Sequence, residues 1–492
     1  MFDFSASMPA KIAFKKIMSD NLTPLMVLEN TAARVLLESA YQETGKERYS
    51  LMMLSCAFLV VKNLGKYTLL AENFTLDLST KDSSKKFLDW LEFFRDLSPQ
   101  KPQELEHIPL PLGGMGYLGY EFFEEIENIV FDKPKIINTY DCAFIFGRDF
   151  LIFDHLYDEA YIVSVGYAKE NQDTPLEANI KAIEEKLLHI KPTIKPIPPS
   201  QKTTPTQIIS KDKQDDYIHA IKCVQDEIYA GNLLQCVPSQ SMQIKTDLPP
   251  LQAYRNLRHK NPSPYMFYFD FCDFKILGAS PEVMIKSQNA TLTLRPIAGT
   301  RPRGETPAKD LHNEKELLND EKENAEHLML VDLGRNDIGK VAVAGSVRVS
   351  EFKSIEKYSK VMHIVSEVTG KLDTQRYTSK DAIYATFPAG TISGAPKIQA
   401  IKTINALEPH KRGIYSGLIG YFDRNGDLDS AIIIRTAVYQ DGIYYLQAGA
   451  GIVYDSNPES EYIETKNKML ALIEAITQEN SENSPQNSLK VR

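Results

Sequence analysis

The chain has 492 residues, of which 43% are hydrophobic and 25% are charged, and its formal net charge is -9. This length is enough for two domains or for several packed layers around a large site. The acidic balance, without a long cluster of lysine and arginine, excludes a nucleic-acid footprint, and the lack of any run of about 18 apolar residues excludes a membrane span.

The amino terminus and the cysteines indicate the compartment. The first residues contain no basic segment followed by a long apolar run and a cleavage site, so we expect no secretory signal and a cytoplasmic protein. The five cysteines are scattered and never spaced as CxxC, which argues against a disulfide framework and against a zinc site.

The first part of the chain predicts strands and one closing helix. Alternating apolar residues over 142–168 predict strands with turns between them, and the apolar period over 174–190 predicts a helix. Prolines and polar residues then replace any apolar period, which is typical of a linker. We therefore expect an amino-terminal α+β domain over 1–190, a linker over 191–207, a second domain over 208–478 and a disordered tail over 479–492.

The second domain mixes helices with β-rich runs. A helix is predicted over 213–232, and strands are predicted over 345–352, 412–422, 430–439 and 442–453. The expected fold class is α+β with large antiparallel sheets. Arg435, inside the apolar run AIIIRTAV, either faces solvent at a sheet edge or is buried against an anion that it binds with two hydrogen bonds.

Two acidic clusters are predicted to lie on helices. Over 320–337, Glu323 and Glu326 are three residues apart and share one helical face, and over 459–476 the residues Glu461, Glu464 and Lys468 share another. Oxygen ligands with room for waters suit Mg²⁺. Such spacing is more often a solvated face with weak ion pairs, so the spacing alone leaves both interpretations open.

Two glycine-containing segments stand out. In FPAGTISGAPK, residues 387–397, glycines and hydroxyls precede a helix predicted to open at Pro396, whose first amides can receive a carboxylate or phosphate. The segment lacks the GK[ST] ending of a P-loop, and a simple helix-entry turn is the alternative.

In PIAGTRPRG, residues 296–304, Ala298 lies beside Gly299. No GxSxG, HExxH or GxGxxG motif is present in a suitable context, which disfavours the corresponding enzyme classes.

Taken together, these segments resemble the chorismate-utilising enzymes, and among them the large subunits of anthranilate synthase. The resemblance is strong over about residues 210 to 475 and weak over the first 60. The matching segments are LGASPEVMI, RPIAGTRPRG, DEKENAEHLMLVDLGRND, VMHIVSEVTG, FPAGTISGAPK, IYSGLIGYF, IIIRTA, GAGIV and EYIETKNKML. The resemblance implies a sandwich of large antiparallel sheets flanked by helices, with a cleft for Mg²⁺ and for the dianion chorismate.

The resemblance also implies roles for individual residues. Glu326 and Glu464 match the metal ligands, and Glu323 and Glu461 match the acids that hold its waters. Glu282 matches the general acid that protonates the departing 4-hydroxyl of chorismate, a task that requires a raised pKa. The remaining catalytic positions are His363, Thr391 and Lys468.

The implied substrate contacts divide between the two carboxylates of chorismate. The metal would take the ring carboxylate, which leaves the enolpyruvyl carboxylate for Arg435, the Tyr415 hydroxyl and the backbone near Gly451. The other residues that the resemblance assigns to substrate binding are Ala298, Gly299, Thr300 and Gly449.

Ala298 bears on the choice of nucleophile. Relatives that add water to chorismate typically carry an activating lysine at this position, aminodeoxychorismate synthases commonly carry a lysine as well, and anthranilate synthases carry alanine. Ammonia needs room at C2 more than it needs a base, so Ala298 favours ammonia. The alternative is that Ala298 merely fits a tight turn beside Gly299.

The resemblance extends to partners and regulation. Ammonia normally comes from glutamine, and no glutaminase segment is recognisable, so a separate glutamine amidotransferase subunit is expected, as in the heterotetramers of similar enzymes. The segments LLES and NPSPYMFY resemble those that enclose the feedback inhibitor tryptophan, through Glu38, Ser39, Pro264, Tyr265 and Met266. Alone, LLES would suggest a helix with two core leucines. Some relatives carry a lysine near the position of Tyr49, which sets this chain apart.

Three rival functions remain. An aminodeoxychorismate synthase subunit of the folate pathway and an isochorismate or salicylate synthase are both disfavoured by Ala298. A non-catalytic tryptophan sensor with the same fold is disfavoured by the intact acidic set and by Glu282, which a sensor would not need.

Overall fold

The computed structural model describes residues 8–39, 48–170, 175–191, 206–358 and 361–477. The predicted tail and all but three residues of the predicted linker lie outside these ranges. Within them, no helix combines the length and the apolar character needed to cross a membrane.

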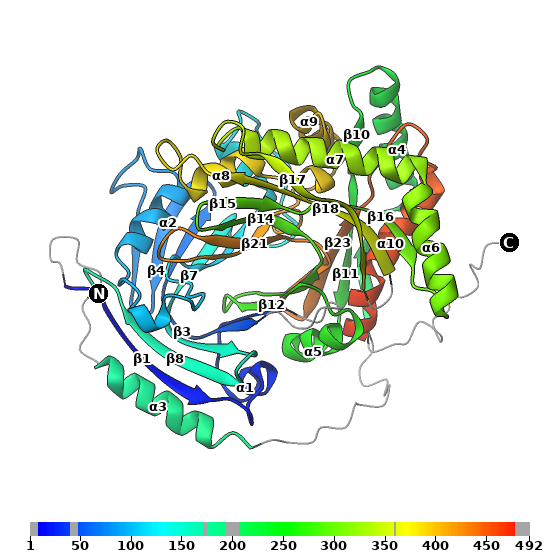
Figure 1. Ribbon diagram of the computed structural model, residues 1–492. Helices are drawn as coiled ribbons and strands as arrows, with labels where there is room; N and C mark the ends of the chain where they lie inside the picture. Colours follow the sequence, from blue (N-terminus) through cyan, green and yellow to red (C-terminus); the bar gives the residue numbers. More distant parts are fainter. Residues whose placement is uncertain (1–7, 40–47, 171–174, 192–205, 359–360, 478–492) are drawn as a thin grey trace.

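The amino-terminal strands form the trunk of a large antiparallel sheet (Figure 1). The longest strands, β3 and β7, pair with each other, and β8, β1, β4, β5 and β6 extend the trunk through further antiparallel pairs. The bounds are β1 Lys11–Met18, β2 Val35–Glu38, β3 Tyr49–Asn63, β4 Lys66–Ala71, β5 Phe74–Asp77, β6 Met115–Leu118, β7 Cys142–Asp154 and β8 Glu159–Gly166.

Two arms of strands from the second half of the chain extend from this trunk. The first arm joins at β6 and contains β20 Leu418–Phe422, β21 Leu428–Ile432, β14 Val283–Gln288, β15 Thr291–Leu294, β18 Val361–Lys371, β16 Ile297–Pro302 and β17 Arg348–Lys357. The second joins at β2 and contains β12 Tyr265–Asp270, β13 Lys275–Ser280, β22 Thr436–Gln440, β23 Ile443–Gly449, β11 Ser239–Lys245 and β9 Gln207–Lys211. A separate short pair is formed by β10 Gln235–Cys236 and β19 Gly394–Ala395. The α+β class with large antiparallel sheets is confirmed.

Helices flank the two arms. In Figure 1, α7 and α8 lie along the upper side of the first arm, α9 packs against the short β10–β19 pair, and α10 and α5 lie beside the second arm. The bounds are α1 Pro24–Asn30, α2 Phe87–Asp96, α3 Leu176–Leu188, α4 Gln214–Tyr229, α5 Pro250–Lys260, α6 Pro307–Asn319, α7 Glu321–Gly339, α8 Ser379–Thr386, α9 Lys397–Leu407 and α10 Pro458–Thr477. The helices predicted over 174–190, 213–232, 320–337 and 459–476 correspond to α3, α4, α7 and α10.

The core crosses the predicted linker. One apolar cluster joins Phe144 and Phe146 of β7 to Leu418 of β20 and Ile432 of β21, all fully buried. Together with the β6–β20 and β2–β12 pairs, this packing unites the two sides of the linker in one sheet system. The division into domains 1–190 and 208–478 stays a prediction.

Four local expectations are corrected. The predicted strand over 412–422 is a turn until Leu418, and the one over 430–439 is interrupted between β21 and β22. The helix expected to open at Pro396 begins at Lys397, with Pro396 as its N-cap. The helical alternative for LLES is wrong, because residues 35–38 form β2, whose backbone pairs with β12 and β3.

Candidate active site

Glu282 lies in the short connection between β13 and β14, where the chain passes into the interior. Its side chain is only 7% exposed, and its carbonyl accepts a hydrogen bond from the Ile432 amide at 3.0 Å. Burial raises the pKa of the Glu282 carboxyl to about 7, and the nearby Thr391 hydroxyl and Arg435 guanidinium oppose only part of this rise. A substantial fraction of Glu282 is therefore protonated near neutral pH, as a general acid requires.

Arg435 lies at the interruption between β21 and β22. It adopts a left-handed backbone conformation, with a φ of 50°, and its carbonyl accepts a hydrogen bond from the Ala279 amide at 3.1 Å. Burial lowers the pKa of its guanidinium, while the proximity of Tyr415, Glu464 and Glu282 counteracts the fall. No described side chain forms an ion pair with Arg435. Of the two interpretations open from the sequence, the solvent-facing sheet edge does not apply, because Arg435 lies in the break between β21 and β22, and burial against an anion stays a prediction.

Tyr415 and Gly449 face each other beside this cation. A Cβ at Gly449 would lie 2.7 Å from the Pro238 carbonyl oxygen and 3.2 Å from the Tyr415 hydroxyl, so a larger residue would displace one of them. Burial raises the pKa of Tyr415, which keeps the phenol neutral and able to donate a hydrogen bond. The Gly449 carbonyl accepts a hydrogen bond from Lys468 Nζ at 2.9 Å. This part of the site thus offers donors suited to a carboxylate.

The PIAGTRPRG stretch forms β16, with a bulge. Register shifts between Ala298 and Thr300 opposite β18, and the extra residue Gly299 has a φ of 69°. Ala298 is 8% exposed and pairs with Ile364. Ala298 therefore lies on a strand beside a bulge and not in a tight turn, and its role in the choice of nucleophile stays a prediction.

His363 on β18 reaches this bulge. Its Nδ1 lies 2.9 Å from the Gly299 carbonyl oxygen and 3.0 Å from the Thr300 hydroxyl. Because a carbonyl only accepts, Nδ1 carries the proton and Nε2 keeps a free lone pair in the neutral ring. Burial lowers the pKa of His363, and the charges of Arg435 and Lys468 add to that effect, so the neutral form prevails. A further predicted residue, Thr391, lies in the 3-10 turn Gly390–Ile392. Its buried hydroxyl lies near the Glu282 carboxyl, but no hydrogen bond of ordinary geometry satisfies it.

The four predicted acids lie on α7 and α10. The Asp320 side chain caps α7 by accepting a hydrogen bond from the Glu323 amide at 3.1 Å, which fixes the helix start and places Glu323 and Glu326 in its first two turns. Burial raises the pKa of Glu326, and the charges of Glu323 and Glu464 raise it further. The same repulsion from Glu464, added to burial, raises the pKa of Glu461. The two helices therefore bring the acids within electrostatic reach of one another.

Cations and amides of the chain already contact these acids. Arg301 lies 3.2 Å from Glu323, Lys468 lies 2.7 Å from Glu464, and Gln235 donates a hydrogen bond of 2.7 Å to Glu326. Among the residues that the structure describes, no three acidic, histidine or cysteine side chains converge closely enough to hold a metal ion. The oxygen donors and their mutual repulsion fit Mg²⁺, but the metal site stays a prediction.

The predicted inhibitor residues come together through strand pairing. Glu38 of β2 lies directly opposite Met266 of β12. Ser39 follows β2, Pro264 precedes β12, and the Tyr265 hydroxyl donates a hydrogen bond to Asp429 at 2.9 Å. The Glu38 carboxylate accepts hydrogen bonds of 2.7 Å from both Tyr254 and Arg258, so it is satisfied within the chain.

Two residues near the site were missed from sequence. Gln235 contacts Glu326, its Oε1 is buried without a hydrogen-bond partner, and a Cβ at Gly451 would lie 2.7 Å from its Nε2. Tyr358 packs edge-on against His363, with ring centroids 5.5 Å apart. An amide in the apolar stretch LLQCV was the only sequence signal for Gln235.

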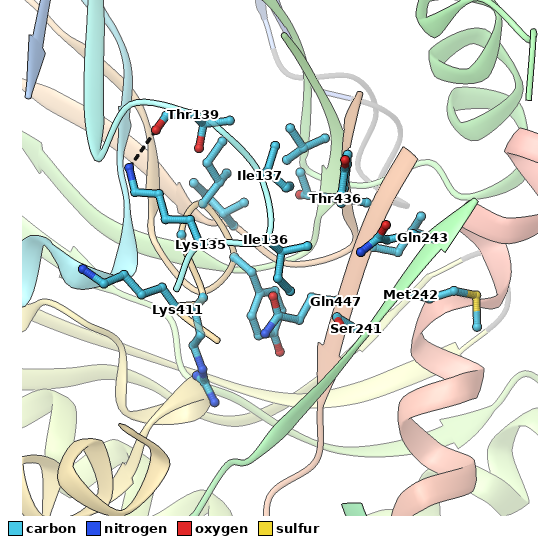
Figure 2. A pocket seen from close by; sticks show the side chains of 18 residues that line it. Lys135, Ile136, Ile137, Thr139, Ser241, Met242, Gln243, Lys411, Thr436 and Gln447 are labelled. Atoms are coloured by element: carbon cyan, nitrogen blue, oxygen red, sulfur yellow. Dashed lines mark hydrogen bonds between the residues drawn. The ribbon is translucent and has the colours of Figure 1, made fainter. Parts of the chain in front are cut away.

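A separate pocket adjoins the site through Tyr415. It lies between residues 135–139 and the strands β11 and β23, and Lys135, Lys411, Ile136 and Gln447 are among its lining residues (Figure 2). Among the predicted site residues, only Tyr415 lines it. The pocket is therefore distinct from the cluster around Glu282 and Arg435.

The chain belongs to the chorismate binding enzyme family, whose model matches residues 41–474. Anthranilate synthase component 1 of Spirochaeta aurantia is 41% identical over 93% of this chain and 94% of the relative, and that of Neisseria meningitidis serogroup B is 39% identical over 94% of each. The solved structure of anthranilate synthase component I from Streptococcus pneumoniae TIGR4 superposes with a TM-score of 0.76 and 33% identity, covering 93% of this chain and 99% of that one. These matches confirm the family resemblance.

Proposed function

We propose that the chain converts chorismate and ammonia into anthranilate and pyruvate. The observation that carries the proposal is the buried Glu282 carboxyl, with a pKa of about 7, close to an Arg435 guanidinium without an ion pair. Its relatives named anthranilate synthase component 1 match nearly the whole chain. An acid that keeps its proton beside an anion-binding cation fits the departure of a hydroxyl group from a carboxylate substrate.

The chain's own residues divide the work. Arg435 and the Tyr415 hydroxyl bind and orient the enolpyruvyl carboxylate, with the backbone at Gly449 and Gly451 leaving room for it. Glu282 donates its proton to the 4-hydroxyl while the ammonia nitrogen bonds to C2, and water leaves. The added nitrogen then releases one proton, which restores the protonated Glu282. In the second stage the bond between the ring and the enolpyruvyl oxygen breaks, C2 loses its proton as the ring becomes aromatic, and the departing enolpyruvate takes up a proton on its methylene carbon to give pyruvate. His363, whose Nε2 can accept, is a base available for that proton.

We propose Mg²⁺ as the cofactor, held by Glu326 and Glu464 directly and by Glu323 and Glu461 through waters. When bound, the ion supplies positive charge that fixes the ring carboxylate. With the ion bound, the charges of Glu323 and Glu464 would be balanced without the ion pairs from Arg301 and Lys468. Lys468 would keep its hydrogen bond to the Gly449 carbonyl.

The partner and the inhibitor complete the proposal. Glutamine would supply ammonia through a separate amidotransferase subunit, in keeping with the component 1 name of the relatives. Tryptophan would act at the end of the β2–β12 pair, beside Glu38, Ser39, Pro264, Tyr265 and Met266. Calorimetry with tryptophan, with and without chorismate and Mg²⁺, tests this site and also separates an enzyme from a sensor: a sensor binds tryptophan and leaves chorismate unchanged.

Ala298 is the residue that supports ammonia as the proposed nucleophile. It is small, buried and on the strand that carries the His363 contact, so it leaves space near the ring where rivals place a lysine. This favours anthranilate over isochorismate and over an aminodeoxy product.

The test is anthranilate fluorescence from the purified chain with chorismate, Mg²⁺ and ammonium at alkaline pH, with Ala298→Lys as the matched variant. Emission that depends on Mg²⁺ is the expected result. Consumption of chorismate without anthranilate emission would assign the chain to a rival synthase, and no consumption would support the sensor.

A further inference from the structure

A second buried arginine, Arg412, lies in the connection between α9 and β20, three residues before Tyr415. Its side chain is 1% exposed and forms an ion pair of 2.6 Å with Glu408, which is also buried. The Glu408 carboxylate accepts further hydrogen bonds from the amide and the hydroxyl of Ser239, at 2.8 and 2.7 Å. The charge of Arg412 is therefore neutralised inside the protein, in contrast to that of Arg435.

The guanidinium of Arg412 has five N–H donors, and all of them are used within the chain. Two are accepted by the Glu408 carboxylate, and the others by the Val237 carbonyl at 2.6 Å, the Ile392 carbonyl at 2.9 Å and the Ser416 hydroxyl at 3.2 Å. With no donor left, Arg412 cannot bind a substrate carboxylate itself. It can act on the site only through its neighbours, and Ser416 directly follows Tyr415.

The hydroxyl of Ser416 is held in a fixed position. The residue is fully buried, its backbone is left-handed with a φ of 65°, and its amide donates a hydrogen bond of 2.9 Å to the Ile433 carbonyl. The start of the same turn is held by the Glu121 carboxylate, which accepts hydrogen bonds from the amides of Arg412 at 2.8 Å and Gly413 at 3.0 Å. These bonds fix the Ser416 hydroxyl relative to the guanidinium.

Tyr415 interacts with both of these residues. Burial raises the pKa of Tyr415, and the Arg412 charge and a hydrogen-bonding contact with the Ser416 hydroxyl oppose part of this rise. The guanidinium carbon lies 5.5 Å from the centre of the Tyr415 ring. Because Arg412 can only donate to the Ser416 hydroxyl, the single proton of that hydroxyl is left for the Tyr415 oxygen. The proton of Tyr415 is then available to an acceptor in the site.

We propose that Arg412 and Ser416 are positioning residues, which orient the Tyr415 hydroxyl as a hydrogen-bond donor to the substrate. This inference rests on the proposed function, in which Tyr415 binds the enolpyruvyl carboxylate, and deepens it. Donation runs from the guanidinium to the Ser416 hydroxyl, from that hydroxyl to the Tyr415 oxygen, and from Tyr415 to the carboxylate. No proton changes its owner, and each donor polarises the next, which strengthens the last bond.

The test is a double-mutant cycle on the Kd for chorismate, measured by calorimetry with Mg²⁺ and without ammonia. Ser416→Ala removes the middle of the donor chain and leaves the ion pair between Arg412 and Glu408 in place. We expect it to weaken chorismate binding by about three- to tenfold, the effect of one hydrogen bond. In the Tyr415→Phe background, which has no hydroxyl to orient, the same substitution should leave the Kd within about twofold.

The two backgrounds separate a positioning role from a merely structural one. A serine that only stabilises the turn would weaken binding equally with tyrosine and with phenylalanine at position 415. A loss of more than about twofold in the Tyr415→Phe background therefore overturns the proposal. A loss of less than about threefold for Ser416→Ala in the otherwise wild-type chain overturns it as well.

Ser164→Ala is the matched control. Ser164 is also fully buried, and its hydroxyl likewise accepts one hydrogen bond, from Asn179 at 3.3 Å, and donates another, to Asp149 at 2.6 Å. It lies on β8, in the trunk of the sheet. This substitution should leave the Kd for chorismate unchanged in both backgrounds, and a loss equal to that of Ser416→Ala would overturn the proposal.

Arg412→Lys tests the first donor of the chain. Lysine keeps a positive charge for Glu408, but it has three donors in place of five and lacks the planar fork. We expect the variant to weaken chorismate binding at least as much as Ser416→Ala does, and a smaller loss would remove Arg412 from the proposal. Thermal unfolding shows whether the variant is folded, and the Ser416 cycle decides alone if it is not.

Binding and turnover distinguish this inference from the proposed function. A chain that binds chorismate and shows the expected cycle, but makes no anthranilate with ammonium, refutes the proposed reaction and supports the orientation of Tyr415. A chain that makes anthranilate and shows equal losses in both backgrounds refutes the orientation alone. A wild-type chain that does not bind chorismate refutes both.

Discussion

Replacing Glu282 with glutamine should lower activity and raise stability at the same time. The carboxyl is buried, and its pKa of about 7 compares with an ordinary value of 4.5. A difference of about 2.5 between the folded and unfolded pKa corresponds to about 3 kcal/mol of unfolding free energy, at 1.36 kcal/mol for each factor of ten. Loss of a general acid typically costs 10²–10⁴ in rate.

The pH at which the stability difference develops follows from the direction of the shift. Below about pH 4.5, the Glu282 carboxyl is protonated in both the folded and the unfolded chain, and it makes no pH-dependent contribution. Between about pH 4.5 and 7, the unfolded chain releases the proton first, so the wild-type protein loses stability as the pH rises. Glutamine cannot ionise, and Glu282→Gln should therefore gain on the wild type up to about 3 kcal/mol by pH 8.

The assay is urea denaturation of both proteins at pH 5 and pH 8, beside kcat for anthranilate formation. The expected result is a stability difference that grows by 2–3 kcal/mol between the two pH values, calculated from the same linkage relation, together with a kcat at least a hundredfold lower. Retention of activity within a few-fold would remove Glu282 as the acid. A stability difference independent of pH would show that burial does not raise its pKa.

Three further outcomes are expected. Arg435→Met should raise the KM for chorismate by about a hundredfold, in line with the loss of about 3 kcal/mol from a charged hydrogen-bonded contact, and an unchanged KM in steady-state assays would contradict this. Gly449→Ala should weaken chorismate binding in calorimetry, because its Cβ meets a carbonyl oxygen at 2.7 Å and the Tyr415 hydroxyl at 3.2 Å, whereas Gly339→Ala, with nothing within 4 Å, should not. Glu326→Gln should abolish Mg²⁺ binding in calorimetry while thermal stability in the metal-free state is kept or increased, since one repelling carboxylate is removed; undiminished Mg²⁺ affinity would place the metal elsewhere.

Long periodic helices and the sheet-rich class were predictable because their signals are local. The apolar period over 213–232 and the acidic faces of 320–337 and 459–476 fall on helices observed within two or three residues of their expected ends. The strand character of residues 35–38 was not predictable, because it depends on β12, more than 200 residues away. Short apolar segments take the conformation of their partners, and a single sequence does not show the partners.

In the candidate site, too, local features were predictable from the sequence and long-range contacts were not. Spacing pointed to the two acidic helical faces, and the family resemblance pointed to Glu282, yet nothing in the order of residues places Gln235 against Glu326. Those relations arise from packing between elements that lie far apart in the chain. The raised pKa of Glu282 likewise depends on burial by the surrounding strands, which composition does not specify.

The backbone conformation at Arg435 determines the environment of its side chain, which the sequence left open. A continuous strand over 430–439 would have pointed alternate side chains to opposite faces and set the arginine among buried isoleucines. The chain instead breaks after Ile432 and passes Arg435 through a left-handed conformation, anchored by the Ala279 amide, before β22 begins. A buried guanidinium without an ion pair is unfavourable on its own, and an entering carboxylate relieves that cost. The left-handed backbone at Arg435 and its missing ion pair are both features that the proposed binding of the enolpyruvyl carboxylate beside Glu282 requires.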